Sequence, residues 1–377
     1  MKRILFLTGT RADFGKLKSL IKAVDNSSYF EAFLFVTGMH LLSKYGMTAN
    51  EVEKSGFKNI YKFINQSDSD SMDIILAKTI QGFSDYVKEV KPDMIVIHGD
   101  RVEALAGSVV GSLNNILVSH IEGGEVSGTI DELIRHSVSK MSHLHFVCND
   151  KAMKRLQQLG ERSDSIFVIG SPDLDIMASD SLPTLHQAKG RYDIAFDSYA
   201  ILLYHPVTTE LNSLKQYTAQ LVDAVLDSKE NYIVIYPNND HGTDTILNEF
   251  ERFHKSNNIK LFPSIRFEYF LTLLKNAKFM IGNSSAGVRE MPFYGLPSIN
   301  IGTRQKGRAK ASSIINCTND YKSILSAIES IDIFNGKAEL EFGIGNSDKL
   351  FFEAISRQST WEVPKQKEFI DQEINHG

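Results

Sequence analysis

Two acidic motifs carry the residues best suited to proton transfer. Glu122 lies in the run 120–125 (HIEGGE), and Asp131 follows at the start of an amphipathic helix pattern. Asp100 ends the run 94–100, whose near-continuous hydrophobicity is typical of a strand buried on both faces. Carboxylates crowded into a partly dry site repel one another, so we expect at least one of the three to hold a proton near neutral pH. Such a cluster can both accept and donate a proton.

A simpler interpretation exists for part of this pattern. Asp131 and Glu132 are also the favourable first-turn anions of an ordinary helix. Asp100 favours a site, because parallel strands bring their carboxyl ends to one sheet edge, where open α/β sheets bind ligands.

The turn at residues 9–16 (GTRADFGK) follows the first apolar run and opens a helix pattern. It matches neither the dinucleotide nor the nucleoside triphosphate loop motif. A helix N-terminus can still hold a phosphate, and Arg11 and Lys16 would add positive charge. The alternative is that Asp13 is a helix cap and Lys16 a solvated side chain.

A similar turn occurs at residues 282–290, where Ser284 and Ser285 follow a strand-like run. Its small residues leave backbone amides uncovered for a diphosphate, although a plain serine cap is the competing interpretation. Glu290 is placed to accept hydrogen bonds from a ribose diol.

Basic side chains accompany this second turn. His205 ends an apolar run and is placed to donate a proton or a hydrogen bond to a leaving group, although a lone histidine is more often structural. Arg304, within the basic run 303–308, supplies charge that a diphosphate would need.

The elements that must position these residues alternate between short apolar runs and helix-length periodic segments, which predicts an α/β fold with parallel sheets. The expected strands are 4–8, 33–37, 94–98, 116–120, 144–148 and 166–169, then 201–204, 232–236, 259–262, 279–282, 298–301 and 314–317.

The two series predict two Rossmann-like, doubly wound domains facing across a cleft, the architecture called GT-B. We expect an N-terminal domain at 1–172 with the acids and a C-terminal domain at 173–357 with the nucleotide site. We also expect a C-terminal helix at about 358–377 that packs back on the first domain, and a hinge near residues 170–183.

Length and composition exclude several classes of protein. A chain of 377 residues is longer than one hydrophobic core usually sustains. Its net charge of -5 does not fit a nucleic-acid binder, and no apolar run predicts a membrane span. Cys148 and Cys317 form no paired motif, so we expect neither a disulfide nor a zinc site and place the protein in the cytoplasm.

The histidines do not predict a metal site. Several of them precede or follow carboxylates, but their spacing matches no metal-binding pattern. They are His40, His98, His120 and His136.

Taken together, the motifs resemble the hydrolysing UDP-N-acetylglucosamine 2-epimerases of bacterial sialic acid biosynthesis. The matching stretches are residues 9–16, 36–40, 98–101, 120–125, 128–136, 282–290 and 302–305. The non-hydrolysing relatives typically carry Gly-Thr-Arg-Pro-Glu and His-x-Glu-Ala-Gly. This chain has Ala12-Asp13 and Gly123-Gly124 at those places, which favours the hydrolysing branch.

The resemblance implies conversion of UDP-N-acetylglucosamine and water into N-acetylmannosamine and UDP, through elimination of UDP to 2-acetamidoglucal and hydration. It needs no cofactor and no metal, since there is no net redox change. By resemblance, the catalytic residues are Asp100, Glu122, Asp131 and His205. The substrate-binding residues are Arg11, Lys16, His40, Arg101, Arg135, Ser284, Ser285, Glu290 and Arg304. The resemblance also implies a role in capsule polysaccharide formation and a homodimer or homotetramer.

Three alternatives stay open. A sister epimerase would act on a UDP-2,4-diacetamido-trideoxyhexose, and the residues that would contact C4 and C6 are not identifiable. A GT-B glycosyltransferase would need one base and no cluster of three acids. A catalytically silent sensor of nucleotide sugars would have no need of three clustered charges.

Overall fold

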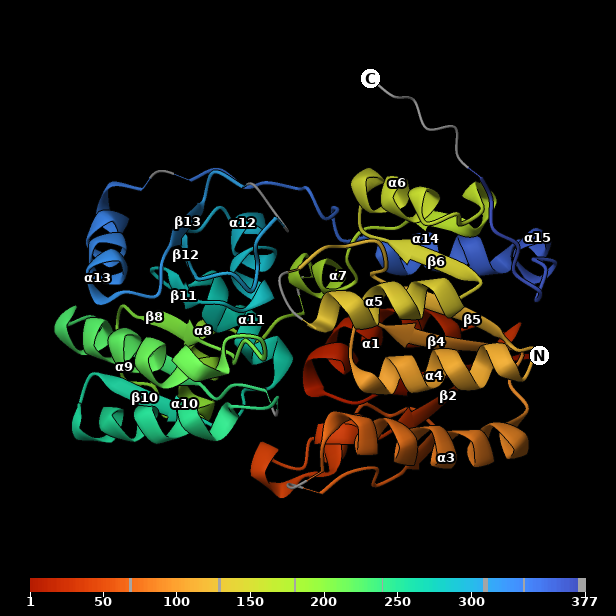
Figure 1. Ribbon diagram of the computed structural model, residues 1–377, viewed down its shortest axis with the longest axis horizontal. Coiled ribbons are helices and arrows are strands. Elements are labelled where there is room, and N and C mark those ends of the chain that lie inside the picture. The colour runs from red at the N-terminus through yellow and green to blue at the C-terminus, as the bar shows by residue number, and fades with distance from the viewer. Residues whose placement is uncertain are drawn as a thin grey trace. The chain divides into compact units, whose positions relative to one another are not determined.

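The computed structural model describes residues 1–67, 70–127, 130–179, 181–238, 240–307, 311–334 and 336–371. The chain divides into two compact units (Figure 1). Unit 1 contains Met1–Glu125, Asp131–Ser179 and Phe342–Gly377, and unit 2 contains Val126–Ile130 and Asp180–Glu341. Gly128, Thr129 and Arg308, which belong to the acidic and basic motifs above, lie outside the described residues.

Unit 1 is built on a parallel sheet of seven strands in the order β3-β2-β1-β4-β5-β6-β7. Its strands are β1 (Lys2–Thr8), β2 (Phe30–Val36), β3 (Asn59–Lys62), β4 (Met94–His98), β5 (Leu117–Ile121), β6 (Leu144–Val147) and β7 (Ile166–Val168). The strand order reverses between β1 and β4, and at such a point the loops after the two strands diverge and leave room for a ligand.

Unit 2 repeats the topology with six parallel strands in the order β10-β9-β8-β11-β12-β13. They are β8 (Ala200–Leu203), β9 (Tyr232–Ile235), β10 (Ile259–Phe262), β11 (Met280–Gly282), β12 (Ser298–Ile301) and β13 (Ile314–Cys317). Here the order reverses between β8 and β11. The expected α/β fold with two Rossmann-like sheets is confirmed.

Helices cover both faces of each sheet (Figure 1). In unit 1 they are α1 (Arg11–Asp25), α2 (Ala49–Glu53), α3 (Met72–Val90), α4 (Val102–Leu113), α5 (Ile130–Met141), α6 (Asp150–Gln158), α7 (Asp173–Met177), α14 (Ser347–Ser356) and α15 (Gln358–Trp361). In unit 2 they are α8 (Leu185–Arg191), α9 (Leu211–Asp227), α10 (Thr243–Phe250), α11 (Phe267–Lys275), α12 (Glu290–Phe293) and α13 (Tyr321–Glu329).

The unit 1 core explains why these segments fold as they do. Apolar residues at helical spacing in α1, such as Leu17 and Ile21, are fully buried with Phe6 of β1 and with Phe351 of α14. On helix α4, Gly107 lets the backbone approach the sheet, since an added Cβ would lie 2.7 Å from Ile97. Both sheet faces are therefore covered, which accounts for the unbroken hydrophobic strands in the sequence.

The structure corrects three expectations about the elements. Strand β3 was not expected, because an edge strand of sequence NIYK lacks the apolar run of a buried strand. Helix α14 belongs to unit 1 although the expected boundary at residue 357 placed it in the second domain, and the apolar pattern of a helix does not say which core it covers. The expected helix at 358–377 is limited to Gln358–Trp361, and the described residues after it, to 371, are not helical.

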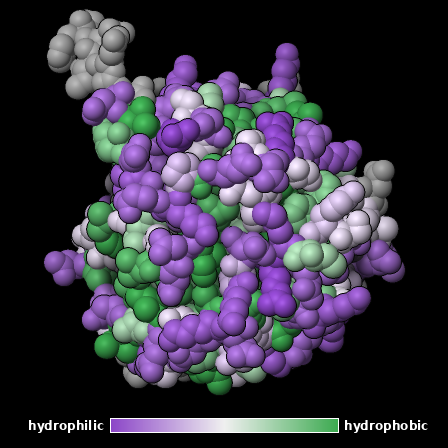
Figure 2. Space-filling model, turned by 90° about the vertical axis from the view of Figure 1, so that its right-hand side faces the viewer, coloured by the Kyte–Doolittle hydropathy of each residue, from purple (hydrophilic) through white to green (hydrophobic). Residues whose placement is uncertain are grey.

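Hydrophilic side chains cover most of the face in Figure 2, and hydrophobic ones form smaller areas among them. Exposed large apolar side chains such as Tyr29 and Leu113, both 74% exposed, are normal at a protein surface. Among the described residues, no helix has the length and apolar character needed to cross a bilayer.

Candidate active site

Most of the expected site residues follow the carboxyl ends of strands at or beside the reversal point of each sheet, and His40 follows β2. In unit 1 they follow β1, β4 and β5, and in unit 2 they follow β8, β11 and β12. These are the carboxyl ends of parallel strands, where open α/β sheets bind ligands.

Glu122 directly follows β5 and is held by several polar groups. Its carboxylate accepts a hydrogen bond from the Ser171 hydroxyl at 2.6 Å and lies 3.4 Å from the Lys16 ammonium. His98 Nε2 is 3.2 Å from Oε2 of the same carboxylate. The backbone of Glu122 has a φ of 66°, in the left-handed region that favours glycine. Strained non-glycine residues concentrate at functional sites, and this one is 4% exposed.

Lys16 has a different environment from the one expected. Its ammonium lies between two carboxylates, 3.4 Å from Glu122 and 3.4 Å from Asp173, and the residue is only 7% exposed. An ammonium held in this way compensates buried negative charge. This environment argues against the expected role of Lys16 beside a phosphate.

Arg135 organises the other two acids. Its guanidinium is 1% exposed, forms an ion pair with Asp100 and donates to the carbonyl oxygen of Glu125 at 3.2 Å. Burial lowers the pKa of Arg135, but the carboxylates of Asp100, Glu125 and Asp131 outweigh burial and raise it. Asp131 lies in the first turn of α5, one helical turn before Arg135. The arginine is therefore the shared counter-ion of the acids expected at 100 and 131.

Cations lie beside all three acids. Glu122 pairs with Lys16, and Asp100 and Asp131 share the field of Arg135. The acids therefore form two cation-paired groups, an arrangement that the sequence did not predict.

The first turn is capped from within the chain. The Asp13 carboxylate accepts from the backbone N–H groups of Gly9 and Thr10, both at 3.0 Å, and Thr10 is the N-cap of α1 in a capping box. Arg11 pairs with Glu51 at 2.6 Å. The amides expected to receive a phosphate are used by Asp13, so the helix-cap interpretation is correct here.

His40 is completely buried and cannot contact a substrate in this structure. Burial lowers its pKa to about 4, so the ring is neutral at pH 7. The Thr8 hydroxyl donates its one proton to Asp13, so His40 Nε2–H donates to Thr8 at 3.0 Å, and Nδ1 accepts from Thr48 at 2.7 Å. The ring supports the turn that holds Asp13 through its bond to Thr8.

Arg101 follows Asp100 and precedes α4. Its Nε lies 3.4 Å from Glu103, which is 2% exposed, while the Arg101 side chain is 23% exposed. Glu103 thereby fixes the direction of a guanidinium at the carboxyl end of β4.

Unit 2 is organised by Asn283, directly after β11. Its side-chain oxygen accepts from the His205 N–H at 2.7 Å, and its amide donates to the His205 carbonyl at 2.8 Å. Gly282 has a φ of 136°, and an added Cβ would lie 2.0 Å from the Leu203 carbonyl oxygen, so only glycine fits between β8 and β11. Asn283 thus joins the two loops at the reversal point.

The His205 ring is oriented by this arrangement. The Asn238 N–H donates to His205 Nδ1 at 3.1 Å. In the neutral ring the proton is therefore on Nε2.

The remaining unit 2 residues surround the same turn. Ser284 caps the short helix Ser285–Gly287 and accepts from the Ala286 N–H at 3.3 Å. Glu290 starts α12 and is 3% exposed. Arg304 donates to the Asn283 carbonyl at 3.3 Å, which places its guanidinium beside the turn. Two short helices, Ser285–Gly287 and α12, follow the turn in place of the single helix that the sequence predicts.

No group of three or more metal-ligating side chains occurs in the part of the chain that the structure describes. The histidines near the acids make ordinary hydrogen bonds, as His120 does with Ser139 and with the Gly99 carbonyl.

Sequence reasoning missed several residues that build the site. Ser171 and Asp173 lie in a segment interpreted only as a hinge, and they reach Lys16 and Glu122 through the fold. Asn283 was within a recognised turn, and its hydrogen bonds to His205 depend on a residue 78 positions away. The only local indication that these residues belong to a site was the polarity of residues 171–173 directly after a strand.

The chain was then compared with known proteins. A family model described as UDP-N-acetylglucosamine 2-epimerase matches residues 22–356. The chain belongs to the UDP-N-acetylglucosamine 2-epimerase family.

Members of this family include proteins closely similar to the chain. A Neisseria meningitidis protein named UDP-N-acetylglucosamine 2-epimerase is 50% identical over 380 residues, covering 98% of this chain and 99% of the relative. A Legionella pneumophila protein named UDP-N,N'-diacetylbacillosamine 2-epimerase (hydrolyzing) is 32% identical, covering 87% and 88%. The fold matches a Neisseria meningitidis UDP-GlcNAc 2-epimerase solved with UDP-GlcNAc, with a TM-score of 0.81 at 19% identity, covering 94% of this chain and 99% of the other.

Proposed function

We propose that this member of the family is a hydrolysing UDP-N-acetylglucosamine 2-epimerase that converts UDP-N-acetylglucosamine and water into N-acetylmannosamine and UDP. The observation that carries the proposal is the pair of cation-bound acid groups, Glu122 with Lys16 and Asp100 with Arg135, at the sheet edge of unit 1. A transferase would need one base, whereas moving a proton off and back onto C2 requires groups on both faces of the sugar.

The first step removes UDP. The C2 proton of the sugar is not acidic in the ground state, because C2 carries an amide nitrogen and no carbonyl. As the C1–O bond to UDP breaks, its electron pair leaves with UDP and C1 becomes cationic, which acidifies the C2–H. One carboxylate of unit 1 takes the proton, the C1=C2 double bond forms, and 2-acetamidoglucal and UDP result.

The second step adds water across the double bond. A protonated acid delivers a proton to C2 from the opposite face, and the hydroxyl of water bonds to C1 while its proton passes to a carboxylate. The sum is UDP-N-acetylglucosamine plus water giving N-acetylmannosamine plus UDP, with C2 inverted.

The residues take distinct roles in this proposal. Asp100, Glu122 and Asp131 exchange protons with the sugar, and Arg101 and Arg135 hold charge beside them. In unit 2, the Nε2–H of His205 donates to the departing diphosphate.

The other unit 2 residues bind UDP in this proposal. Ser284 and Ser285 offer hydroxyl and backbone groups to the phosphates, Arg304 adds charge, and Glu290 accepts from the ribose. Arg11, whose guanidinium pairs with Glu51 at 2.6 Å, adds positive charge on the phosphate side in this proposal.

The relatives support this proposal at two levels. The Neisseria relative, at 50% identity over almost the whole chain, supports UDP-N-acetylglucosamine as substrate. The Legionella relative is named as hydrolyzing, which supports hydrolysis within this branch of the family. As a producer of N-acetylmannosamine, the protein would catalyse the first step of sialic acid biosynthesis, in the cytoplasm and as a homodimer or homotetramer.

The deciding experiment is proton NMR of the purified protein with UDP-N-acetylglucosamine in heavy water. The expected products are UDP and free N-acetylmannosamine with deuterium at C2. Formation of UDP-N-acetylmannosamine would contradict hydrolysis, and intact substrate would contradict the proposed sugar.

A second candidate substrate is a UDP-2,4-diacetamido-trideoxyhexose, because the Legionella relative is named for such a sugar. The same spectrum with that substrate separates the two. A higher kcat/KM for the diacetamido sugar would replace the first candidate and leave the chemistry at C1 and C2 unchanged.

A further inference from the structure

The last described residues of the chain, 363–371, lie on unit 1 and are here named the C-terminal strap. The strap follows α15 and is fixed at several points. The Ile370 N–H donates to the Gly160 carbonyl at 3.0 Å, and the Lys365 carbonyl is 3.0 Å from His143 Nε2. The Phe369 ring lies 4.7 Å from the Lys140 ammonium.

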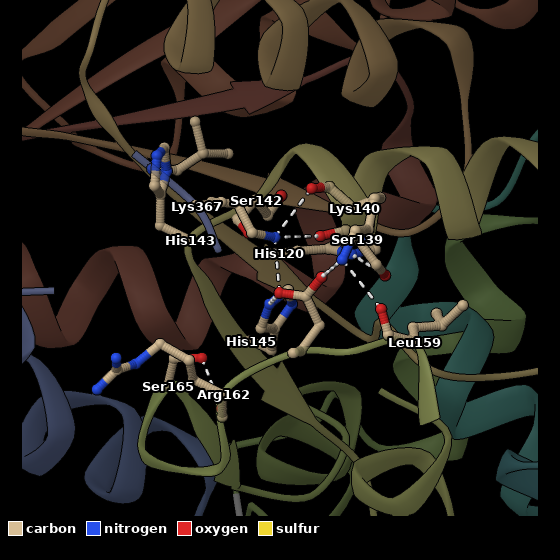
Figure 3. A network of polar contacts seen from close by, with 12 residues as sticks. His120, Ser139, Lys140, Ser142, His143, His145, Leu159, Arg162, Ser165 and Lys367 are labelled. Carbon is tan, nitrogen blue, oxygen red and sulfur yellow. Dashed lines mark hydrogen bonds and ion pairs between the residues drawn. The ribbon is translucent and has the colours of Figure 1, made fainter. Parts of the chain in front are cut away.

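Lys367 is the centre of these contacts. Its ammonium donates to the backbone carbonyls of Ser139, Lys140 and Ser142, at 3.4, 2.9 and 2.5 Å (Figure 3). Ser139 and Lys140 lie in the last turn of α5 and Ser142 directly follows the helix, where the Ser142 N–H also donates to the Ser139 carbonyl at 3.1 Å. Carbonyls at this end of a helix lack the partners that the helix interior supplies. A cation at this end satisfies them and interacts favourably with the helix dipole.

Glu161 holds Lys367 in place. Its carboxylate is 2.6 Å from the Lys367 ammonium, 3.0 Å from the Lys140 ammonium and 3.0 Å from His145 Nε2. Burial raises the pKa of Glu161, but the hydrogen bond from His145 and the charge of Lys367 outweigh it and lower the pKa to about 2. The buried carboxylate is therefore charged at pH 7 and fixes the ammonium against the end of α5.

The opposite end of α5 carries the proposed chemistry. Asp131 lies in its first turn, and Arg135 follows one turn later and pairs with Asp100. A helix transmits a shift at one end to the other, because its backbone is a single hydrogen-bonded rod. The strap thus holds the helix that places two of the proposed site residues.

A second connection runs through side chains. The Ser139 hydroxyl donates to His120 Nδ1 at 2.9 Å (Figure 3). His120 Nε2 donates to the Gly99 carbonyl at 2.8 Å. Burial lowers the pKa of His120 to about 3, so the ring is neutral and its one proton is on Nε2. Gly99 precedes Asp100, so the end of α5 that Lys367 caps is also joined to the loop of that acid.

We propose that Lys367 is a positioning residue of the active site, which acts by fixing the C-terminal end of α5 and through it the placement of Asp131, Arg135 and Asp100. It touches none of the reacting atoms. The proposal rests on the proposed function for its effect on catalysis, and its effect on α5 is measurable without it.

The test compares three variants of the full chain. Lys367→Met removes the charge and keeps most of the side-chain volume, and Lys367→Arg restores a cation that can reach carbonyl oxygens. Lys365→Met is the matched control, because it removes a charge from the same strap at an exposed side chain. For each, kcat and KM for UDP-N-acetylglucosamine, the Kd of UDP and hydrogen exchange of the α5 peptide are measured well below the unfolding temperature.

We expect Lys367→Met to lower kcat by about 10- to 100-fold, as displacement of catalytic groups does, with the Kd of UDP unchanged. Lys367→Arg should recover most of kcat, and Lys365→Met should match the unaltered protein. Exchange in α5 should quicken by about fivefold or more in Lys367→Met only. The proposal is overturned if kcat and α5 exchange are the same in Lys367→Met and Lys365→Met, or if UDP binding falls as much as kcat does.

Failure of the proposed function would be visible separately. In that case the unaltered protein does not convert UDP-N-acetylglucosamine. Hydrogen exchange of α5 alone then decides whether Lys367 fixes that helix. Faster α5 exchange in Lys367→Met than in Lys365→Met supports the positioning role, and equal exchange overturns it.

Discussion

The two units share a strand order and differ in what they place at the reversal point. In unit 1 the loops after β1, β4 and β5 carry charged side chains that are buried in pairs, such as Lys16 with Glu122. In unit 2 the loops after β8 and β11 carry small residues and are joined by one neutral side chain, Asn283. The same topology therefore supports two kinds of site, and the loops decide which kind.

The difference has an energetic side. Burying an ion pair costs desolvation that its own attraction does not always recover, so buried pairs are weak evidence for stability. Unit 1 contains several such pairs around Glu122 and Arg135, and the proposed proton transfer would use them. The turn of unit 2 also leads into buried charges, Arg289 at 1% and Glu290 at 3% exposure, but the proposed anion site there would rely on backbone amides and a few donors.

The largest expected effect comes from neutralising an acid of unit 1. Glu122→Gln keeps the shape of the side chain and removes its ability to accept a proton, so kcat should fall by about 10²- to 10⁴-fold. The Kd of UDP, measured by calorimetry, should stay the same if unit 1 does the chemistry and unit 2 binds. Glu132→Gln is the control, because this first-turn carboxylate of α5 lies 3.5 Å from His136 and is outside the proposed machinery. Near-normal turnover in Glu122→Gln would remove this residue from the mechanism.

The second effect concerns stability, and it singles out unit 1 at acid pH. Burial lowers the pKa of His40 from 6.5 to about 4, while in the unfolded chain the ring titrates near 6.5. The unfolded state then binds more protons below pH 6.5, so stability is complete above that pH and is lost as pH falls. For His40 the loss is about 3 kcal/mol near pH 4, and His120 adds to it because its pKa is lowered to about 3.

The single tryptophan, Trp361, reports on this loss, because it lies in α15 and stacks on Phe30 of β2. Urea unfolding followed by its fluorescence should show a lower midpoint at about pH 5 than at about pH 7. His40→Gln should flatten this dependence, and His254→Gln, with a side chain 55% exposed, should not. Asp175 acts in the opposite direction, since burial raises its pKa to about 6 and its protonation below that pH favours the fold.

The third effect tests unit 2. Asn283→Ala removes two hydrogen bonds that join the turn to His205, each of which contributes about 1 kcal/mol, so the Kd of UDP should rise by up to about 30-fold. Asn231→Ala, which removes an exposed hydrogen bond to Ser198, is the control. If Asn283→Ala lowers kcat and leaves UDP binding intact, unit 2 takes part in the chemistry and does not only bind UDP.

The sequence predicted the fold well because both sheets are buried on both faces. Their strands appear as short apolar runs with helical patterns between them, which is a local signal. The missed strand β3 lies at a sheet edge and has no such run. The expected boundary at residue 357 assigned α14 to the second domain, because the apolar face of a helix fits any core, and only the folded chain shows that Phe351 packs with unit 1.

The site was harder to predict, since its side-chain partners come from distant positions. Strand ends placed Asp100, Glu122 and His205 at the sheet edges, but nothing in the sequence says that Lys16 reaches Glu122, 106 positions away. The same limit applies to His40, where the resemblance to the family implied substrate contact and the structure buries the ring.

A smaller effect on turnover than that of Glu122→Gln concerns Ser171, which joins Glu122 to the segment of unit 1 that precedes Asp180. Ser171→Ala removes one hydrogen bond of 2.6 Å to a charged acceptor and leaves Lys16 and His98 beside the carboxylate. Hydrogen bonds to charged groups contribute about 1.5 to 3 kcal/mol, so kcat should fall by roughly 10- to 100-fold, less than for Glu122→Gln. Ser165→Ala, which removes a buried hydroxyl bonded to the Arg162 carbonyl, is the control for loss of a hydroxyl.

In the double variant Ser171→Ala/Glu122→Gln the loss should be no greater than in Glu122→Gln alone, because Ser171 acts through that carboxylate. Additive losses would show instead that Ser171 acts on the substrate by itself. Unit 1 would then use a neutral hydrogen-bond donor in addition to its charged pairs, as unit 2 does.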